Sequence, residues 1–544
     1  MEDAPPESPQ QPCPAAPDWS LDWVVDCGGL LVVRGTLLPA AGEDFHGLTL
    51  ELGGARHHCQ RLCATSPAGA PPPGLAFATV LVHRPQSGRI GATLYCEGPD
   101  GRRQALPSRH CTVQPLQRGE RRGGRDHPLQ QGVRRALSLL RSGGPRVLAN
   151  KLRRYGRALQ PRLPALRTLQ ATVAGSRDVH LFIDHGLGGG AGGICDQRVA
   201  DAVARGGAAL RIQSDPLGRC YRVSFQCGDR TVRGPCRSLA WLEDLPGGTV
   251  RAAELHTAAH FLEPGLLFAM LLRLQLQQAV PLRIHLHDYF LVCPSHFLLA
   301  DSGTFCGIPA LRDCERCLPA NANVVHGAYR RLQPAAWRQL CGLLLRSAAA
   351  ITVYSRSSEA LLRRAYPELG PVECEPPTLP SLPPPLPRPG DTTRLHIGVI
   401  GEVGRHKGSD VVAALAAHLE AHHPDERITV IGTIEASCRG RVLRQTGPYA
   451  PGSLAAQLAR AGVNVILFPS IVPETFSFTI REATATGLPV ACFSLGAQAE
   501  WLASYRAGAL LKSMEPASVY RELGELLKRS YPPLLARSTA SGGS

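Results

Sequence analysis

Two blocks of alternating strand and helix patterns, separated by a proline-rich stretch, constrain this chain most. In residues 176–375, apolar runs such as "DVHLFID", "AALRIQS" and "RIHLHDYFLV" alternate with helix-like segments. In residues 391–530, "LHIGVIG", "ITVIGT", "NVILFPS" and "LPVACF" alternate with helix-like segments in the same way. Strands that alternate with helices build parallel sheets with helices on both faces. The sequence therefore predicts an α/β protein with two doubly wound, Rossmann-like domains that face a cleft.

The stretch between the blocks, "EPPTLPSLPPPLPRPG", contains eight prolines between Pro376 and Pro389. Proline has no amide hydrogen and a fixed φ, so such a stretch builds neither helix nor sheet. We predict a stiff interdomain linker over residues 376–390. Ligands of open α/β sheets bind beyond the carboxyl ends of the strands, so two such domains predict a site in the cleft between them.

The N-terminal part follows a different pattern. Residues 1–20 are acidic and rich in Pro, which predicts a disordered leader and is unlike a signal peptide. Over residues 21–117, short runs such as "GLLVVRGTL" and "LAFATVLVH" alternate with turn residues, which predicts a small all-β sandwich domain. This domain carries no catalytic constellation, so we expect an accessory or docking module. Residues 531–544 are predicted to be a tail.

Positive charge is concentrated in residues 118–175, which we predict to be a basic helical linker. The chain has a net charge of +15, and the stretch from Arg118 to Arg167 contains 14 Lys and Arg against two acidic residues. Residues 118–167 could bind an anionic membrane surface or a phosphorylated lipid carrier, or could be a solvated linker. Nucleic-acid binding is disfavoured, because Tyr155 is the only aromatic residue there, and we predict no nucleic-acid partner.

The cellular setting follows from two features of the sequence. No run of about 18 uncharged apolar residues is present, so no transmembrane helix is predicted. We expect a cytoplasmic protein. The basic segment would also allow a peripheral position on the inner face of the membrane. The 18 cysteines are then predicted to be mostly reduced. Only four lysines accompany the many arginines, a bias typical of GC-rich coding and of a bacterial source.

Two glutamates flank a helix start in the second block. The segment "FPSIVPETFSFTIREATATGLPVACF" places Glu474 just after an apolar strand and Glu482 inside the following helix. Eight helical residues advance about 12 Å, so these carboxylates cannot share a proton but could hold the two ends of a sugar nucleotide. The amides of Phe476, Ser477 and Phe478 would be free donors for a diphosphate. The alternative is an ordinary amphipathic helix with exposed acids.

A cationic turn precedes another helix in the same block. In "IGVIGEVGRHKGSDVV" a strand runs into a Gly-rich turn, and Arg405 and Lys407 stand just before the helix. Lys407 is one of only four lysines in the chain. Cationic groups beside a helix N-terminus can bind and neutralise a leaving pyrophosphate.

Residues 176 to about 515 resemble the retaining GT-B glycosyltransferases of family 4, a group that includes glycogen synthases and phosphatidylinositol mannosyltransferases. The resemblance lies in the Glu-x7-Glu spacing followed by "ATATGLPV". It implies that Glu474 contacts the donor sugar, Glu482 the ribose, and Lys407 the diphosphate. Arg405 would share that last role, although it stands closer to Lys407 than is usual in the family. Ser477 replaces a common Gly, which leaves its backbone amide usable.

The resemblance extends to the first block. "DHGLGGGAGG" matches the family's Gly-rich loop and implies that Gly188, Gly189 and Gly190 approach the donor phosphates and the acceptor. "HLHDY" resembles the histidine segment, which makes His287 the contact to the transferred sugar, with Asp288 beside it on the acceptor side. The implied catalytic residues are His287, Lys407 and Glu474. No cofactor is required, because the nucleotide sugar is itself the substrate.

Four cysteines follow the histidine segment in "HDYFLVCPSHFLLADSGTFCGIPALRDCERCL", namely Cys293, Cys306, Cys314 and Cys317. They include a C-x2-C pair, so they could bind a structural zinc ion or an iron–sulfur cluster, with His296 as a further candidate ligand. Similar loops occur in a bacterial subset of the resembled family. Separate packed or surface thiols are the alternative.

The sequence as a whole predicts an enzyme that transfers a sugar from a nucleotide donor to a glycan or lipid-linked acceptor in bacterial surface polysaccharide synthesis. The resemblance implies transfer on one face of the sugar, with the departing phosphate helping to deprotonate the incoming hydroxyl. Such a reaction needs no protein nucleophile, and the chain shows no convincing nucleophile–base arrangement. A nucleotide-sugar epimerase of the same fold is one alternative. A catalytically silent scaffold that binds glycans is the alternative from another class.

Overall fold

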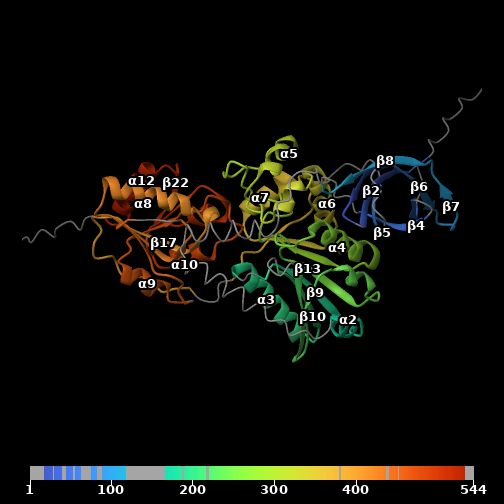
Figure 1. Cartoon of the computed structure of the whole chain (residues 1–544), viewed down its shortest axis with the longest axis horizontal. Coiled ribbons are helices and arrows are strands. Elements are labelled where there is room, and N and C mark those ends of the chain that lie inside the picture. The colour runs from blue at the N-terminus through green and yellow to red at the C-terminus, as the bar shows by residue number, and fades with distance from the viewer. Residues whose placement is uncertain are drawn as a thin grey trace, which may run out of the picture.

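The computed structural model describes residues 17–28, 30–39, 45–52, 55–62, 75–82, 89–117, 166–186, 189–215, 220–378, 382–436, 440–450 and 452–532. Three parts follow one another along the long axis of the molecule: a β domain in blue, an N-terminal α/β domain in green to yellow, and a C-terminal α/β domain in orange to red (Figure 1). Most of the predicted leader, residues 118–165 of the basic segment, and residues 533–544 lie outside the described residues.

Eight strands build the β domain: β1 (Asp18–Asp26), β2 (Leu30–Leu38), β3 (Gly47–Leu52), β4 (Ala55–Arg61), β5 (Leu75–Val82), β6 (Arg89–Glu97), β7 (Arg103–Ala105) and β8 (Arg109–Pro115). Their order is β3-β4-β5-β2-β1-β8-β6-β7, and β3 also pairs with β6. The all-β class is as predicted, but this extra pairing closes the sheet into a barrel-like form instead of a two-layered sandwich. Strand β1 begins at Asp18, so the last residues assigned to the leader belong to the sheet.

Strand β2 is buried on both faces, which explains its unbroken apolar run. Leu31 and Val33 face the interior of the β domain, whereas Leu30 and Val32 belong to a core shared with the N-terminal α/β domain. Helix α4 (Pro264–Gln278) lies against the β domain, and the Gln277 side chain donates a hydrogen bond to the Val80 carbonyl at 2.7 Å. We define this continuous set of side chains as the shared core.

The N-terminal α/β domain is built on a second eight-stranded sheet. In order β12-β11-β10-β9-β13-β14-β15-β16, its strands β9, β10 and β13 to β16 run parallel, while β11 and β12 form an antiparallel edge. Helix α2 packs into the shared core through Leu169 and Val173, so part of the predicted basic linker belongs to this domain. The elements are α2 (Leu166–Ala174), β9 (Val179–Asp184), α3 (Gly189–Ala204), β10 (Ala208–Asp215), β11 (Cys220–Cys227), β12 (Arg230–Cys236), η1 (Ala240–Asp244), β13 (Val250–Leu255), α4, β14 (Leu282–His285), α5 (Leu311–Ala320), η2 (Gly327–Arg331), α6 (Pro334–Ser347), β15 (Ala350–Val353), α7 (Arg356–Ala365) and β16 (Glu373–Cys374).

The C-terminal α/β domain has an all-parallel sheet in the order β19-β18-β17-β20-β21-β22. This is the order 3-2-1-4-5-6 of a Rossmann fold, and the direction of winding reverses between β17 and β20. The predicted architecture of two Rossmann-like domains after an all-β domain, the GT-B arrangement, is confirmed. The elements are β17 (His396–Val403), η3 (Arg405–Lys407), α8 (Ser409–His422), β18 (Arg427–Ile434), β19 (Leu443–Gln445), α9 (Leu454–Ala461), β20 (Val465–Phe468), α10 (Phe478–Ala485), β21 (Val490–Phe493), α11 (Gly496–Leu502), β22 (Gly508–Leu511) and α12 (Pro516–Ser530).

The two α/β domains touch directly. The carboxylate of Glu500 on α11 accepts hydrogen bonds from the first two amides of α7, those of Arg356 at 3.0 Å and Ser357 at 2.7 Å. The proline-rich linker runs along the C-terminal domain, where the Leu386 amide donates to the Thr486 carbonyl at 2.8 Å. The linker is therefore partly packed on one domain.

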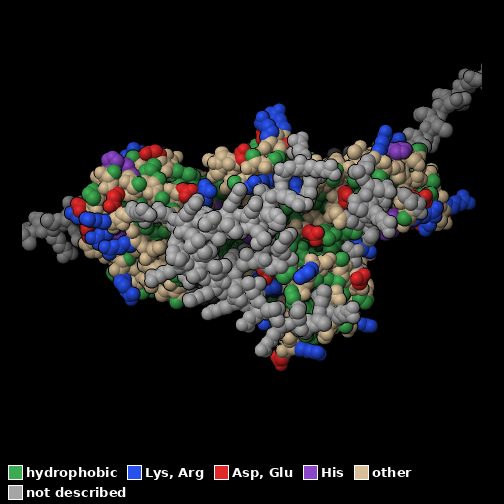
Figure 2. Space-filling view, in the orientation of Figure 1, with side chains coloured by type: hydrophobic (Ala, Val, Ile, Leu, Met, Phe, Trp, Pro, Cys, Tyr) green, Lys and Arg blue, Asp and Glu red, His purple; other side chains and the backbone are tan. Residues whose placement is uncertain are grey.

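On the face shown in Figure 2, the Lys and Arg side chains of the described residues form small groups, one of them at the protruding tip over α5. Among the described residues, no helix combines the length and the apolar character needed to cross a membrane.

Candidate functional site

The loops that follow β17 and β20 meet at the point where the winding of the C-terminal sheet reverses. Gly408 lies in the left-handed region with φ +82°, and a Cβ at this residue would stand only 1.9 Å from the Pro469 carbonyl oxygen. The Ile471 amide donates to the His406 carbonyl at 3.2 Å, which joins the same two loops. Glycine thus permits the close approach that sets Lys407 beside the loop leading to Glu474.

The two predicted cations of this turn differ in their surroundings. Arg405 is exposed, and its Nε lies 3.3 Å from the Asp410 carboxylate on α8. Lys407 is half-buried, and its ammonium group has no ion-pair or hydrogen-bond partner among the residues that the structure describes. Lys407 is therefore a cation without a described partner at this edge of the sheet, whereas Arg405 pairs with the helix that follows it, through a contact between two exposed side chains. The predicted role of Arg405 stays a prediction.

The backbone of Glu474 is held tightly in place. Its amide donates to the Gln498 side chain at 3.0 Å, and its carbonyl accepts from the Ala497 amide at 2.9 Å. Gly496, with φ +60°, allows this contact, because a Cβ there would lie 2.5 Å from the Glu474 nitrogen. Within the described part of the chain, the buried Oε1 of Glu474 has no hydrogen-bond partner. A buried acceptor without a donor costs free energy, and a ligand hydroxyl would relieve that cost.

Helix α10 begins with unused backbone donors. The Ser477 side chain caps the helix by accepting from the Ile480 amide at 3.4 Å. The amides of Phe476, Ser477 and Phe478 have no partner among the described residues, as expected for the first turn of a helix. Three such amides pointing from a helix N-terminus suit a phosphate group.

Glu482 lies one to two turns further along α10, half-buried. Burial raises the pKa of its carboxyl, and no described residue donates a hydrogen bond to it. Tyr449 lies near enough to feel this charge, since burial and then Glu482 raise the pKa of Tyr449 to about 12. Tyr449 was missed by the sequence analysis, because it stands in a loop with no motif around it.

The predicted residues of the N-terminal domain meet this helix across the domain boundary. A Cβ on Gly190, at the start of α3, would come within 2.2 Å of the Phe478 ring. The Thr475 hydroxyl donates to the His287 carbonyl at 2.9 Å. The structure therefore brings Gly190 and His287 to the start of α10. Gly189 is next to Gly190 and has φ +79°, and Gly188 lies outside the described residues.

His287 belongs to a cluster of histidines at the carboxyl ends of neighbouring parallel strands. His256 follows β13, and its Nδ1 lies 3.0 Å from His287 Nε2. One ring must donate and the other accept, so the two rings cannot both be doubly protonated. Burial, followed by His256 and His285, holds the pKa of His287 well below its usual range. His287 is therefore a neutral imidazole at neutral pH.

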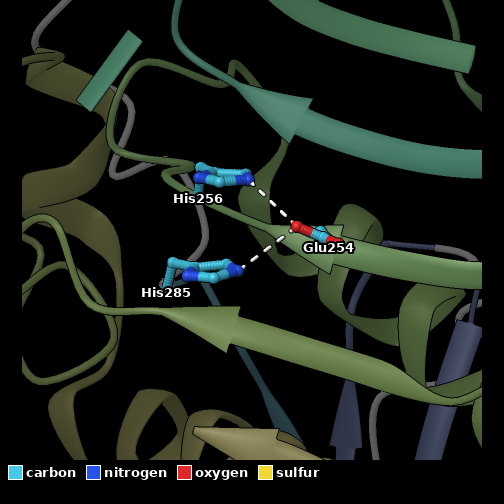
Figure 3. Close-up of side chains that lie close together, drawn as sticks. All are labelled: Glu254, His256 and His285. Carbon is cyan, nitrogen blue, oxygen red and sulfur yellow. Dashed lines mark ion pairs between the residues drawn. The ribbon is translucent and has the colours of Figure 1, made fainter. Parts of the chain in front are cut away.

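Glu254 on β13 lies beneath these rings, and His256 and His285 both point toward its carboxylate (Figure 3). The His256 and His285 Nε2 atoms lie 3.4 Å and 3.2 Å from Glu254 Oε2. All three ligand atoms lie within 4.8 Å of one another, as in a metal site. However, Arg198 pairs with both carboxylate oxygens, and its permanent charge would repel a metal cation. We therefore interpret the group as an Arg198–Glu254 ion pair with two histidine rings beside the carboxylate.

Asp288 uses its carboxylate to join its own loop to the loop that follows β13. One oxygen accepts from the Thr257 hydroxyl and the other from the Phe290 amide at 2.8 Å. Asp288 thus fixes the turn after His287, and its predicted place on the acceptor side stays a prediction. His256, which the sequence analysis missed, had a detectable signal, because "AELHT" and "RIHLHD" both end strands with histidine.

The histidine network predicts that the protein loses stability in mild acid. Burial lowers the pKa of His285 to about 4, whereas an unfolded histidine titrates near 6.5. Between these values the unfolded chain binds a proton that the folded chain does not, so stability falls as the pH falls from 6.5 to 4. His285 alone would remove about 3 kcal/mol by pH 4.

Unfolding measured at several pH values between 7 and 4 would check this. His285→Gln should flatten the pH profile, while His422→Gln, at an exposed site on α8, should leave it unchanged. A stability independent of pH over this range would contradict the prediction.

Residues 394–529 match the family model described as glycosyl transferases group 1. A D-inositol 3-phosphate glycosyltransferase from Corynebacterium urealyticum is 28% identical over 148 residues, which cover 24% of this chain and 34% of that protein. The chain thus spans about a third of the length of this curated relative.

Among solved structures, Anabaena Alr3699/HepE in complex with UDP-glucose is similar at 15% identity and a TM-score of 0.40, covering 65% of this chain and 90% of that one. The pneumococcal O-GlcNAc transferase GtfA, in complex with UDP and GlcNAc, is similar at 12% identity and a TM-score of 0.32, covering 57% and 58%. The region matched by the family model contains Lys407, Glu474 and Glu482.

Proposed function

We propose that this protein is a retaining GT-B glycosyltransferase that moves a sugar from a nucleotide-sugar donor to a glycan or lipid-linked acceptor. The observation that carries the proposal is a set of polar groups without partners among the described residues, gathered where the C-terminal sheet reverses its winding. They are the Lys407 ammonium, the buried Oε1 of Glu474 and the amides at the start of α10. The match of this domain to group 1 glycosyl transferases supports the same assignment.

Each group suits one portion of a nucleotide sugar. The ammonium of Lys407 and the amides of α10 would neutralise the diphosphate, whose charge increases as the glycosidic bond breaks. The Glu474 carboxylate would accept hydrogen bonds from sugar hydroxyls, and Glu482, further along the same helix, from the ribose diol. His287, neutral and in contact with Thr475 across the cleft, would contact the transferred sugar from the opposite domain.

The transfer itself would proceed on one face of the sugar. The departing phosphate oxygen would take the proton from the incoming hydroxyl, and Lys407 would stabilise the charge that develops on the phosphate. No protein nucleophile is needed in this scheme. The close contact between the two domains would exclude water and so limit hydrolysis of the donor.

We propose that the acceptor is a saccharide of bacterial surface polysaccharide synthesis. It would be either linked to a lipid or part of a growing glycan. The basic segment 118–167 supports this assignment, because its 14 Lys and Arg would attract an anionic membrane surface or a phosphorylated carrier. The similarity to an enzyme named for inositol phosphate is consistent with an acceptor that carries a phosphate.

A donor screen tests the proposal. The full chain should show an increased unfolding temperature with at least one of the UDP-, GDP- and dTDP-sugars, since a ligand that binds only the folded state stabilises it. The same donor should release nucleoside diphosphate when membrane lipid extract is added. Absence of stabilisation by every donor would favour the catalytically silent scaffold.

Glu482→Gln should weaken donor binding more than it slows the chemical step. The amide keeps the size of the side chain but removes the charge that strengthens hydrogen bonds to the ribose, so KM for the donor should rise about tenfold with little change in kcat. Glu525→Gln, at an exposed site on α12, is the matched control. An unchanged donor KM in Glu482→Gln would remove Glu482 from the binding site.

A further inference from the structure

Four cysteines lie in the segment that follows β14 and includes α5, and nothing in the transfer chemistry uses them. Cys293 closes the turn after β14, since its amide donates to the Tyr289 carbonyl at 2.9 Å. Cys306 follows the short Leu299–Phe305 bridge, and Cys314 and Cys317 stand one turn apart on α5. All four are half-buried and none forms a disulfide.

Amide groups are directed at two of the sulfur atoms. The Asp301 amide donates to Cys317 Sγ at 3.3 Å, and the Asn321 side chain donates to the same sulfur at 3.5 Å. The Ile308 amide donates to Cys306 Sγ at 3.5 Å. A thiol is a weak acceptor, whereas a thiolate is a strong one. Such donors are therefore most effective when the sulfurs are thiolates, the form that binds metals.

The backbone after Cys306 has an uncommon conformation at the residue that makes one of these contacts. Gly307 has φ +63° and Ile308 has φ +58°, two consecutive residues in the left-handed region. For a β-branched residue this conformation is strained, at a cost of about 1–3 kcal/mol. The turn brings the Ile308 amide to the Cys306 sulfur two residues earlier. The strained conformation and this hydrogen bond therefore occur at the same residue.

We propose that Cys293, Cys306, Cys314 and Cys317 together bind a metal centre through four thiolates. Four cysteines are a complete ligand set for a structural zinc ion and for an iron–sulfur cluster. No three of these sulfurs, all in the described region, lie within 4.8 Å of one another. Sulfurs around a single zinc ion stand about 3.8 Å apart, given Zn–S bonds of about 2.3 Å, so this arrangement does not fit one zinc ion. The proposal is therefore an iron–sulfur cluster, in which each thiolate binds a different iron atom or shares one of several.

The position of the segment gives the centre a role. The segment carries Phe297, whose ring stacks on His406 of the C-terminal domain with centroids 4.1 Å apart and an interplanar angle of 7°. His406 is the neighbour of Lys407. The metal centre would hold the segment in shape and so position Phe297 against the turn that presents Lys407. This role depends on the proposed function, whereas metal binding does not.

Metal analysis of the full chain tests the proposal directly. Protein purified without oxygen should contain iron together with acid-labile sulfide and should absorb visible light, whereas zinc in place of iron would contradict the cluster. Cys306→Ser and Cys317→Ser should each lower the metal content at least tenfold. Cys227→Ser, at an exposed site at the end of β11, is the matched control and should retain it.

A second measurement covers the case in which a serine variant does not fold. In the wild-type protein, native-state alkylation followed by mass spectrometry should find the four cysteines protected until a chelator is added, while Cys227 reacts throughout. The proposal is overturned if protein prepared with and without oxygen lacks iron and acid-labile sulfide and takes up neither from ferrous iron with sulfide. It is equally overturned if the four thiols react at the same rate with and without chelator.

Discussion

Replacing Lys407 by alanine should slow sugar transfer about a hundredfold to a thousandfold. Lys407 has no ion-pair or hydrogen-bond partner among the described residues, and a nucleotide-sugar donor carries its leaving charge on the diphosphate. Removal of a preorganised charge at the point where charge develops affects the transition state more than the ground state. The loss should therefore appear mainly in kcat, measured as nucleoside diphosphate release at saturating donor.

Two further variants sharpen this prediction. Lys528→Ala, at an exposed site near the end of α12, removes the same charge on another element and should leave the rate unchanged. Lys407→Arg keeps the charge but changes its geometry, and should restore part of the rate. If Lys407→Ala transfers sugar at the wild-type rate, the diphosphate is not held by this turn.

Val32→Asp should destabilise the fold by more than about 4 kcal/mol, because it places an unpaired carboxylate in the shared core. Val32 is fully buried between the β domain and the N-terminal α/β domain. A charge there would either separate the two domains or stay buried without a partner. We expect a large fall in soluble yield and in unfolding temperature. The N-terminal α/β domain and the β domain should lose their protection from hydrogen exchange together.

Leu38→Asp is the control for this substitution. Leu38 ends the same strand but is 45% exposed, so the same change should shift the unfolding temperature only slightly. Hydrogen exchange would report on each domain separately. If α4 in Val32→Asp keeps the exchange protection of the wild type, the two domains do not fold as one unit.

The sequence predicted the α/β domains well because the information is local. Each strand and helix of these domains has its own hydrophobic period, and the proline-rich stretch marks the boundary between them. The positions of Lys407 and Glu474 followed from the same pattern, since both stand just beyond strands that become neighbours at the reversal of winding. Contacts that depend on strand order, such as the approach of the two loops that carry these residues, could not be predicted from the sequence and were found in the structure.

Long-range pairing accounts for what the sequence could not predict. The closure of the β domain depends on β3 meeting β6, and nothing in either strand specifies that partner. The same holds for the contact between Gly190 and Phe478, which are 288 residues apart in the chain and belong to different domains. Arg405 illustrates a third limit, because its pairing with Asp410 depends on the rotamers of two exposed side chains.

The capping of α7 by Glu500 has a consequence for the catalytic cycle. A capping carboxylate stabilises a helix by about 1 kcal/mol, and here helix and cap lie on different domains. When the domains separate, both amides and the carboxylate return to water, so this stabilisation is available only in the shut form. The contact would act as a weak clasp that favours the arrangement of the two domains seen in this structure over a separated one.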